Sequence, residues 1–131
     1  MKIILASHSK LAEGMSQTAQ FFGLSEIAVI EQTMDDTGFE TRARDLLNLY
    51  KNEDVVVFTD IVGGSVNQIF TRLLREYQFH LISGMNLPLI LEIGFKNEID
   101  LTTINEMIEQ AKNQIVYMND FINTILEDEE D

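Results

Sequence analysis

Four short apolar segments alternate along the chain with longer segments whose apolar residues recur at helical spacing. The short segments are KIILAS (2–7), EIAVIE (26–31), DVVVFTD (54–60) and FHLISG (79–84). Continuous apolar runs of this length are typical of strands buried on both faces of a parallel sheet. The alternation therefore predicts an α/β fold with three layers: an open, mainly parallel sheet with helices on both faces.

The predicted helices are marked by spacing and by their ends. Apolar residues at helical spacing run through residues 11–22, 39–50 and 66–77, and the last clear helix covers residues 100–113. Asn86 and Pro88 indicate the start of one further helix, which ends near Gly94.

The chain's 131 residues suit a single domain, and the sequence shows no internal repeat or linker. The absence of cysteine excludes disulfides, thiolate metal sites and cysteine nucleophiles. No apolar run is long enough for a signal peptide or a membrane-spanning helix, so we expect a soluble, cytoplasmic protein. The acidic end EDEED, residues 127–131, is expected to be a disordered tail.

The charge is strongly acidic, with 22 Asp and Glu against 9 Lys and Arg and a net charge of -13. Such a field repels nucleic acid and attracts a basic protein partner. The alternative interpretation is that the charge serves only solubility.

Polar and glycine-containing segments follow three of the predicted strands. His8 follows the first strand, Asp60 and Gly63-Gly64-Ser65 follow the third, and residues 83–86 (SGMN) follow the fourth. In a parallel sheet the carboxyl ends of the strands share one edge, where ligands and chemistry are found. The sequence therefore predicts a site at that edge.

The residue types at this edge suit phosphoryl chemistry. A neutral imidazole is a nucleophile near pH 7, and a carboxylate that accepts a hydrogen bond from one ring nitrogen leaves the other free to attack. Asp60 is the candidate carboxylate. Gly63 and Gly64 allow close backbone approach, and Ser65 is a candidate cap for a helix whose amino end attracts anions.

Each of these features also has a structural interpretation. A histidine can simply end a strand, and Gly-Gly-Ser can simply turn the chain. His80, within the fourth strand, is expected to be a packed or hydrogen-bonded sheet histidine. The sequence contains no Walker-type loop and no cluster of histidines and carboxylates at ligand spacing, so we expect neither direct ATP use, nor a cofactor, nor a metal.

Three segments, ASHSKLAEG, FTDIVGGSVNQIF and ISGMNLPLILE, resemble in order the signature segments of the IIA component of the mannose/fructose/sorbose-type sugar phosphotransferase system (PTS). The resemblance implies that His8 accepts a phosphoryl group, through Nε2, from the histidine-containing phosphocarrier protein. It then passes the group to a histidine of the IIB component, which serves the membrane IIC and IID components. Asp60 would orient His8, and Gly63, Gly64 and Ser65 would bind the phosphoryl group.

The resemblance also implies a homodimer in which a C-terminal strand, near residues 115–120, is exchanged antiparallel onto the partner's sheet. The apolar pattern of this segment fits an extension of the last helix equally well. Candidate partner-surface residues lie in the loops beside His8: Val62, Val66, Met85, Asn86 and Leu87.

One departure concerns the family's aromatic residue before the glycine pair and proline after the serine. Here Ile61 or Val62 and Val66 take those positions. Two other functions stay open. One is the phosphotransferase subunit of a dihydroxyacetone kinase system, which shares the fold, and the other is a non-catalytic, flavodoxin-like phosphate-binding module. A regulatory protein with a degenerate site is disfavoured, because His8 and Asp60 are both present.

Overall fold

The structure, a computed structural model, describes residues 1–130 and contains one four-stranded parallel sheet. The strands, in the spatial order β2-β1-β3-β4, are β2 (Ile27–Gln32), β1 (Lys2–His8), β3 (Val55–Thr59) and β4 (His80–Ser83). The helices are α1 (Leu11–Phe21), α2 (Phe39–Leu49), α3 (Ser65–Leu73), α4 (Leu87–Gly94), α5 (Leu101–Lys112) and α6 (Met118–Glu130).

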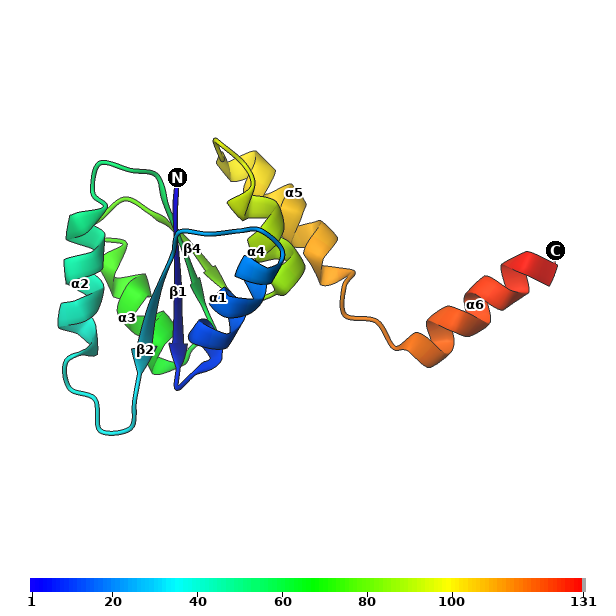
Figure 1. Ribbon diagram of the computed structural model, residues 1–131, viewed down its shortest axis with the longest axis horizontal. Helices are drawn as coiled ribbons and strands as arrows, with labels where there is room; N and C mark the ends of the chain where they lie inside the picture. The colour runs from blue at the N-terminus through cyan, green and yellow to red at the C-terminus, as the bar shows by residue number, and fades with distance from the viewer. Residues whose placement is uncertain (131) are drawn as a thin grey trace.

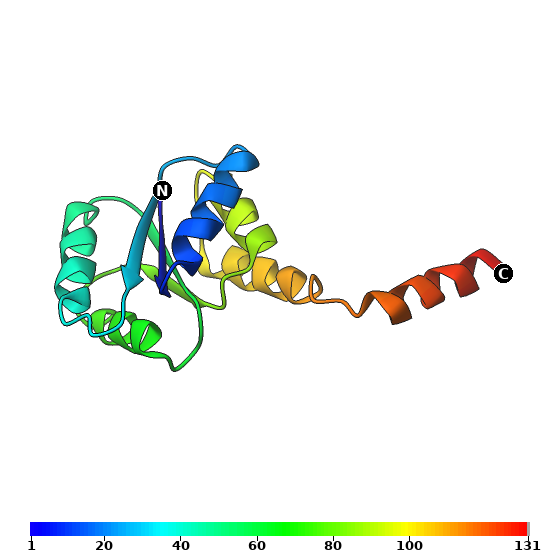
Figure 2. The same cartoon turned by 60° about the horizontal axis from the view of Figure 1, so that its bottom comes forward.

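Helices cover both faces of the sheet, which confirms the predicted fold class. Figure 1 shows α2 and α3 on one face and α1, α4 and α5 on the other, and the turned view in Figure 2 shows the same arrangement. The strand order reverses between β1 and β3, which are both in the middle of the sheet.

Alternate residues of the central strands serve two separate cores. Ile3 and Leu5 of β1 pack with α1, α4 and α5, whereas Ile4 and Ala6 pack with α2 and α3. All five residues of β3 are buried. Continuous apolar runs are needed because a strand between two helical layers has no solvent face.

Side-chain caps fix the starts of two helices. The Asn86 side chain accepts a hydrogen bond from the Leu89 N–H at 2.9 Å, and Pro88 lies in the first turn of α4, as the sequence predicted. Asp100 accepts a hydrogen bond from the Thr103 N–H at 2.8 Å at the start of α5. No helix among residues 1–130 is long and apolar enough to cross a bilayer.

The C-terminal segment differs from the expected strand. Residues 113–117 lie outside helices and strands, and α6 begins at Met118 and stands away from the sheet (Figures 1 and 2). A strand that forms by pairing with a second copy is not expected in a single chain, so the exchange stays a prediction.

Residues 127–130 of the predicted disordered tail form the end of α6, and Asp131 lies outside the described residues. A 13-residue helix without tertiary contacts is marginal in water, so disorder of this tail in solution also stays a prediction.

Candidate active site

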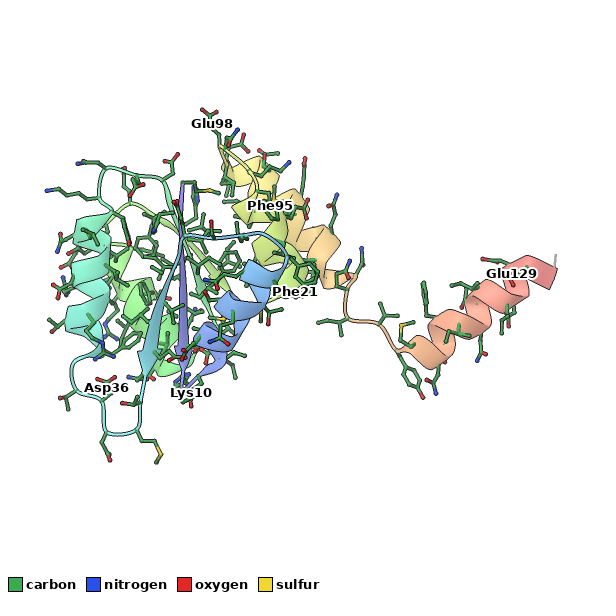
Figure 3. The ribbon with its side chains drawn as sticks, viewed as in Figure 1. Lys10, Phe21, Asp36, Phe95, Glu98 and Glu129 are labelled. Carbon is green, nitrogen blue, oxygen red and sulfur yellow. The ribbon has the colours of Figure 1, made fainter. Side chains whose placement is uncertain are left out.

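The candidate site lies at the carboxyl ends of β1 and β3, beside the point where the strand order reverses. Such a point is where ligands bind in open α/β sheets. His8 is the last residue of β1, and Asp60 directly follows β3. In Figure 3, Lys10 and Asp36 mark this end of the sheet, and Phe95 and Glu98 mark the opposite end.

Asp60 holds His8 by two hydrogen bonds to one carboxylate oxygen. Its Oδ2 lies 2.9 Å from the backbone nitrogen of His8 and 2.8 Å from ring Nδ1, while Oδ1 accepts from the Ile61 N–H at 3.0 Å. Burial works to raise the pKa of Asp60, but the hydrogen bonds from the His8 backbone and ring, and the ring's charge when protonated, outweigh burial. The pKa therefore lies below its ordinary value.

The ionised carboxylate determines which ring nitrogen carries a proton. Because an ionised Asp60 can only accept hydrogen bonds, Nδ1 of His8 must be the donor. In the neutral ring, Nε2 then carries the lone pair. The His8 side chain keeps 42% of its surface exposed, while that of Asp60 keeps 11%. The geometry therefore leaves Nε2 as the ring nitrogen that carries the lone pair.

Ser65 approaches His8 from the first residue of α3. Its Oγ lies 3.0 Å from His8 Nε2 and donates to Gln32 Oε1 at 2.5 Å. The expectation that Ser65 caps α3 is wrong: Gly64, in extended conformation, is the N-cap residue, and no side chain caps this helix. The Ser65 hydroxyl is instead turned toward His8 and Gln32.

The glycine pair shapes the loop between β3 and α3. Gly63 has φ +80°, a left-handed conformation that favours glycine, and its N–H donates to Asn67 Oδ1 at 3.1 Å. The Gly64 N–H donates to the Ile61 carbonyl at 3.2 Å. Both amides, expected to contact the phosphoryl group, are thus engaged inside the loop in this structure.

Gly64 is also a point of close approach. A Cβ atom at this position would lie 2.8 Å from Ile61 Cγ2 and 3.1 Å from His8 Cε1. Glycine therefore allows the loop to pass directly against the imidazole ring.

Sequence reasoning missed Gln32 and Asn67. Asn67 is buried, and its Nδ2 donates to Thr59 Oγ1 at 3.0 Å while its Oδ1 holds the Gly63 N–H, so it ties the loop to the end of β3. Gln32 pairs with His8 in the β1–β2 register. That register, available once parallel pairing of the first two strands is assumed, is the signal that points to Gln32.

A hollow of about 320 Å³ opens beside His8. It is lined by His8, Ser9, Lys10, Glu31, Gln32, Thr33 and Met34. The Ser65 hydroxyl and the amides of the first turn of α3, which have no acceptor within the helix, are the donors available to an anion at Nε2. Among residues 1–130, no three His, Asp or Glu side chains are arranged to hold a metal ion.

The predicted partner-surface residues differ in how exposed their side chains are. Val62 is 78% exposed, and its neighbour Ile61, at 57%, adds a second apolar group. Val66 is fully buried among the core residues of α2 and α3, so its place on a partner surface is wrong. Met85, Asn86 and Leu87 are partly buried, and the Asn86 side chain is occupied as a helix cap.

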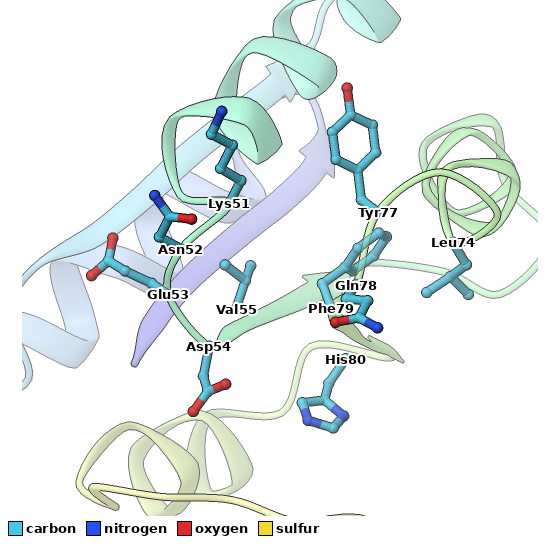
Figure 4. A pocket seen from close by; sticks show the side chains of 10 residues that line it. All are labelled: Lys51, Asn52, Glu53, Asp54, Val55, Leu74, Tyr77, Gln78, Phe79 and His80. Carbon is cyan, nitrogen blue, oxygen red and sulfur yellow. The ribbon is translucent and has the colours of Figure 1, made fainter.

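His80 lies at the opposite, amino end of the sheet. It is the first residue of β4, partly buried, and lines a larger hollow of about 590 Å³ together with Asp54, Tyr77 and Phe79 (Figure 4). No side-chain hydrogen bond to the His80 ring is present among residues 1–130, in contrast to His8 with its carboxylate partner. The size of this hollow therefore does not make it the better candidate for catalysis.

Comparison with known proteins identifies the family to which the chain belongs. The sequence model of the family described as "PTS system fructose IIA component" matches residues 2–112. No curated protein sequence matches the chain. A Klebsiella pneumoniae structure described as a phosphoenolpyruvate-dependent sugar PTS permease is 30% identical, with 92% of this chain and 93% of that chain covered and a TM-score of 0.80.

Two further structures share the fold at lower identity. The mannose/sorbose-specific IIA subunit of Enterococcus faecalis is 21% identical over 88% of this chain and 92% of that chain, with a TM-score of 0.80. The PTS IIA protein associated with the fucose utilization operon of Streptococcus pneumoniae is 24% identical, covers 92% and 95%, and has a TM-score of 0.79. Because the family match spans most of the described chain, the protein belongs to the fructose/mannose IIA family of the sugar phosphotransferase system.

Proposed function

We propose that His8 is the residue through which this PTS component relays phosphoryl groups. It accepts the group from the histidine-containing phosphocarrier protein and passes it to a histidine of the IIB component, which serves membrane components IIC and IID. The proposal places the protein in the cytoplasm. The observation that carries it is the 2.8 Å contact between Asp60 Oδ2 and His8 Nδ1, which leaves Nε2 as the free nucleophile.

The transfer is a displacement at phosphorus. The Nε2 lone pair of His8 forms a bond to the phosphorus atom while the N–P bond of the donor breaks, and its electron pair returns to the donor's ring. As the His8 ring becomes positively charged, the ionised Asp60 beside Nδ1–H compensates the charge. The Ser65 hydroxyl and the first-turn amides of α3 then donate to the phosphoryl oxygens. The reverse sequence delivers the group to IIB.

The test is phosphorylation of the whole chain by phosphoenolpyruvate, enzyme I and the phosphocarrier. The wild type should gain one acid-labile, base-stable phosphate, and His8→Ala should gain none while keeping its circular dichroism spectrum. His80→Ala is the matched control and should be phosphorylated normally. Phosphate on His8→Ala, or none on the wild type, would contradict the proposal.

The predicted homodimer belongs to the same proposal. In the single chain β4 is an edge strand, and an apolar groove of about 360 Å³ lies beside it between β4, Leu89 and α5. The C-terminal segment carries apolar side chains that are exposed in one chain: Ile115, Val116, Tyr117, Met118, Phe121, Ile122, Ile125 and Leu126. We propose that this segment of a second copy covers the groove.

Light scattering of the full chain tests the dimer. The wild type should have twice the mass of one chain, and Val116→Asp should shift it toward the monomer. Thr124→Asp, on the same segment but polar, is the control. A monomeric wild type would contradict the exchange without affecting the assignment of His8.

A further inference from the structure

Gln32 is brought to the site by the sheet itself. It pairs with His8 in the parallel register of β1 and β2, so the two side chains leave the same face of the sheet. Ser65 of α3 lies between them, with its Oγ 2.5 Å from Gln32 Oε1 and 3.0 Å from His8 Nε2. Three elements thus contribute one line of polar atoms that ends at the nucleophile.

The hydrogen bonds along this line of atoms cannot all form in every protonation state of His8. Ser65 has one hydroxyl proton and is flanked by two groups that can accept it. When that proton is donated to Gln32 Oε1, the Ser65 oxygen can only accept from Nε2, which suits a doubly protonated His8. A neutral His8 with its proton on Nδ1 instead places two lone pairs against each other.

Rotation of the Gln32 amide by 180° reverses the preference. Its NH₂ group would then donate to Ser65 Oγ, and the Ser65 hydroxyl would donate to Nε2 of a neutral ring. Both arrangements keep every heavy atom near its place. The two orientations of the Gln32 amide differ only in which protonation state of the His8 ring can make both of its hydrogen bonds.

We propose that Gln32 is a positioning residue, which sets the direction of the Ser65 hydroxyl and thereby the ease with which His8 Nε2 is protonated or left free to attack. This inference rests on the proposed function for its meaning in catalysis. With its carbonyl oxygen toward Ser65, Gln32 draws the hydroxyl proton away from Nε2 and favours the protonated ring, so phosphoryl acceptance is limited on the acid side.

Other charged groups around the ring are unchanged by substitution of Gln32. Asp60 contacts the His8 ring from the end of β3, and Lys10 and Glu31 line the hollow beside it; the Glu31 side chain leaves the other face of β2, where its carboxylate accepts from the Glu13 N–H at 3.3 Å. Residues 61–64 and the first turn of α3 carry no charged side chain. Differences between Gln32 variants therefore report on Gln32.

Two variants should move the titration of His8 in opposite directions. Gln32→Met keeps the length but neither accepts nor donates, so Ser65 can turn to Nε2; the protonation midpoint of His8, read from its ring ¹⁵N shifts, should fall. Gln32→Glu is a fixed acceptor with a negative charge, so the midpoint should rise. Each shift should be about half a pH unit or more, the size that one hydrogen bond produces. The pH below which the rate of phosphoryl acceptance declines should move in the same direction as this midpoint.

Ser65→Ala separates the proposed route from a direct effect of charge. With Ser65 removed, Gln32→Met should no longer shift the midpoint, and Gln32→Glu should keep only the part due to its charge. An unchanged midpoint in Gln32→Met, or an equal shift in the Ser65→Ala background, would overturn the inference. Ring titration needs no phosphoryl donor, so this result is distinct from failure of the wild type to accept phosphate.

Discussion

At the scale of single residues, Asp60 Oδ2 lies 2.8 Å from His8 Nδ1, and in the proposed transfer this carboxylate orients the ring and compensates its charge. Asp60→Asn keeps the shape of the side chain but loses the negative charge that compensates the positive charge developing on the His8 ring during transfer. We expect phosphoryl acceptance to slow by about ten- to a hundredfold, the value of a hydrogen bond to a charged group. Rapid-quench measurement of acceptance tests this. Asp54→Asn, before the other end of β3, is the matched control and should transfer at the wild-type rate.

The same carboxylate predicts a dependence of stability on pH. The pKa of Asp60 is lower in the folded chain than its ordinary value of 3.8, so the fold favours the ionised form. Its contribution is fully present above 3.8 and is lost as the pH falls through the folded value. The difference in unfolding free energy between wild type and Asp60→Asn should therefore be constant at higher pH and shrink as the pH falls below 3.8 in urea titrations. A constant difference would show that the hydrogen bonds to His8 do not stabilise the ionised acid.

The close packing around Gly64 predicts that a larger side chain there disturbs His8. The Cβ atom of Gly64→Ala would lie 3.1 Å from His8 Cε1 and 2.8 Å from Ile61 Cγ2, so the His8 ring, the Ile61 side chain or the loop must shift. Phosphoryl acceptance should fall at least tenfold, because a misplaced reacting group is costly, while the protein stays folded. Gly14→Ala, where the new Cβ meets nothing within 4 Å, is the control. Equal rates in the two variants would show that the close approach is not needed.

Sequence reasoning found the residues whose chemistry is recognisable and missed those whose role is only positional. His8, Asp60 and Ser65 were expected together because the carboxyl ends of parallel strands share an edge, and the structure places them within hydrogen-bond distance. Gln32 was missed because an amide at a strand end has no chemical signature until its neighbour across the sheet is known. The engaged amides of Gly63 and Gly64 depend on loop geometry that composition does not encode.

At the scale of elements, Asn67 joins α3, the glycine loop and β3. Its side chain is the partner of both Thr59 Oγ1 and the Gly63 N–H. Asn67→Ala removes the hydrogen-bond partner of both groups, and we expect the unfolding free energy to fall by about 1–3 kcal/mol. Thr18→Ala, at an exposed position of α1, should cost about 0.5 kcal/mol or less. Chemical denaturation of both variants makes the comparison, and equal stabilities would contradict this role for Asn67.

The strands and the first five helices could be predicted because burial within one chain determines them. The central strands are mostly apolar since each faces two helical layers, and α4 begins directly after the predicted Asn86 cap. Residues 115–120 could not be predicted in the same way. Their apolar side chains are exposed in the single chain, so the conformation they adopt depends on what covers them.

At the scale of the whole molecule, the carboxyl end of the sheet carries both acidic and exposed apolar residues. Glu31 lines the His8 hollow, and its carboxylate accepts from the backbone N–H of Glu13, while Ile61 and Val62 are exposed in the loop after β3. Asp36 is neutralised locally by Arg42 at 2.7 Å, and this hydrogen bond is the main cause that lowers its pKa.

The acidic charge of the chain predicts how the rate of association with the phosphorylated carrier depends on salt. A relay protein must bind its donor briefly, and complementary charge accelerates association more than it prolongs the complex. The second-order rate of transfer from the phosphorylated carrier should therefore fall as added salt shortens the Debye length from ~30 to ~8 Å. Stopped-flow measurement across that range tests this, with Glu13→Gln expected to lower the rate at low salt. Glu98→Gln, at the opposite end of the sheet (Figure 3), removes the same charge and should have the smaller effect. A rate that is flat with salt would assign the net charge of -13 to solubility and leave recognition to Ile61 and Val62.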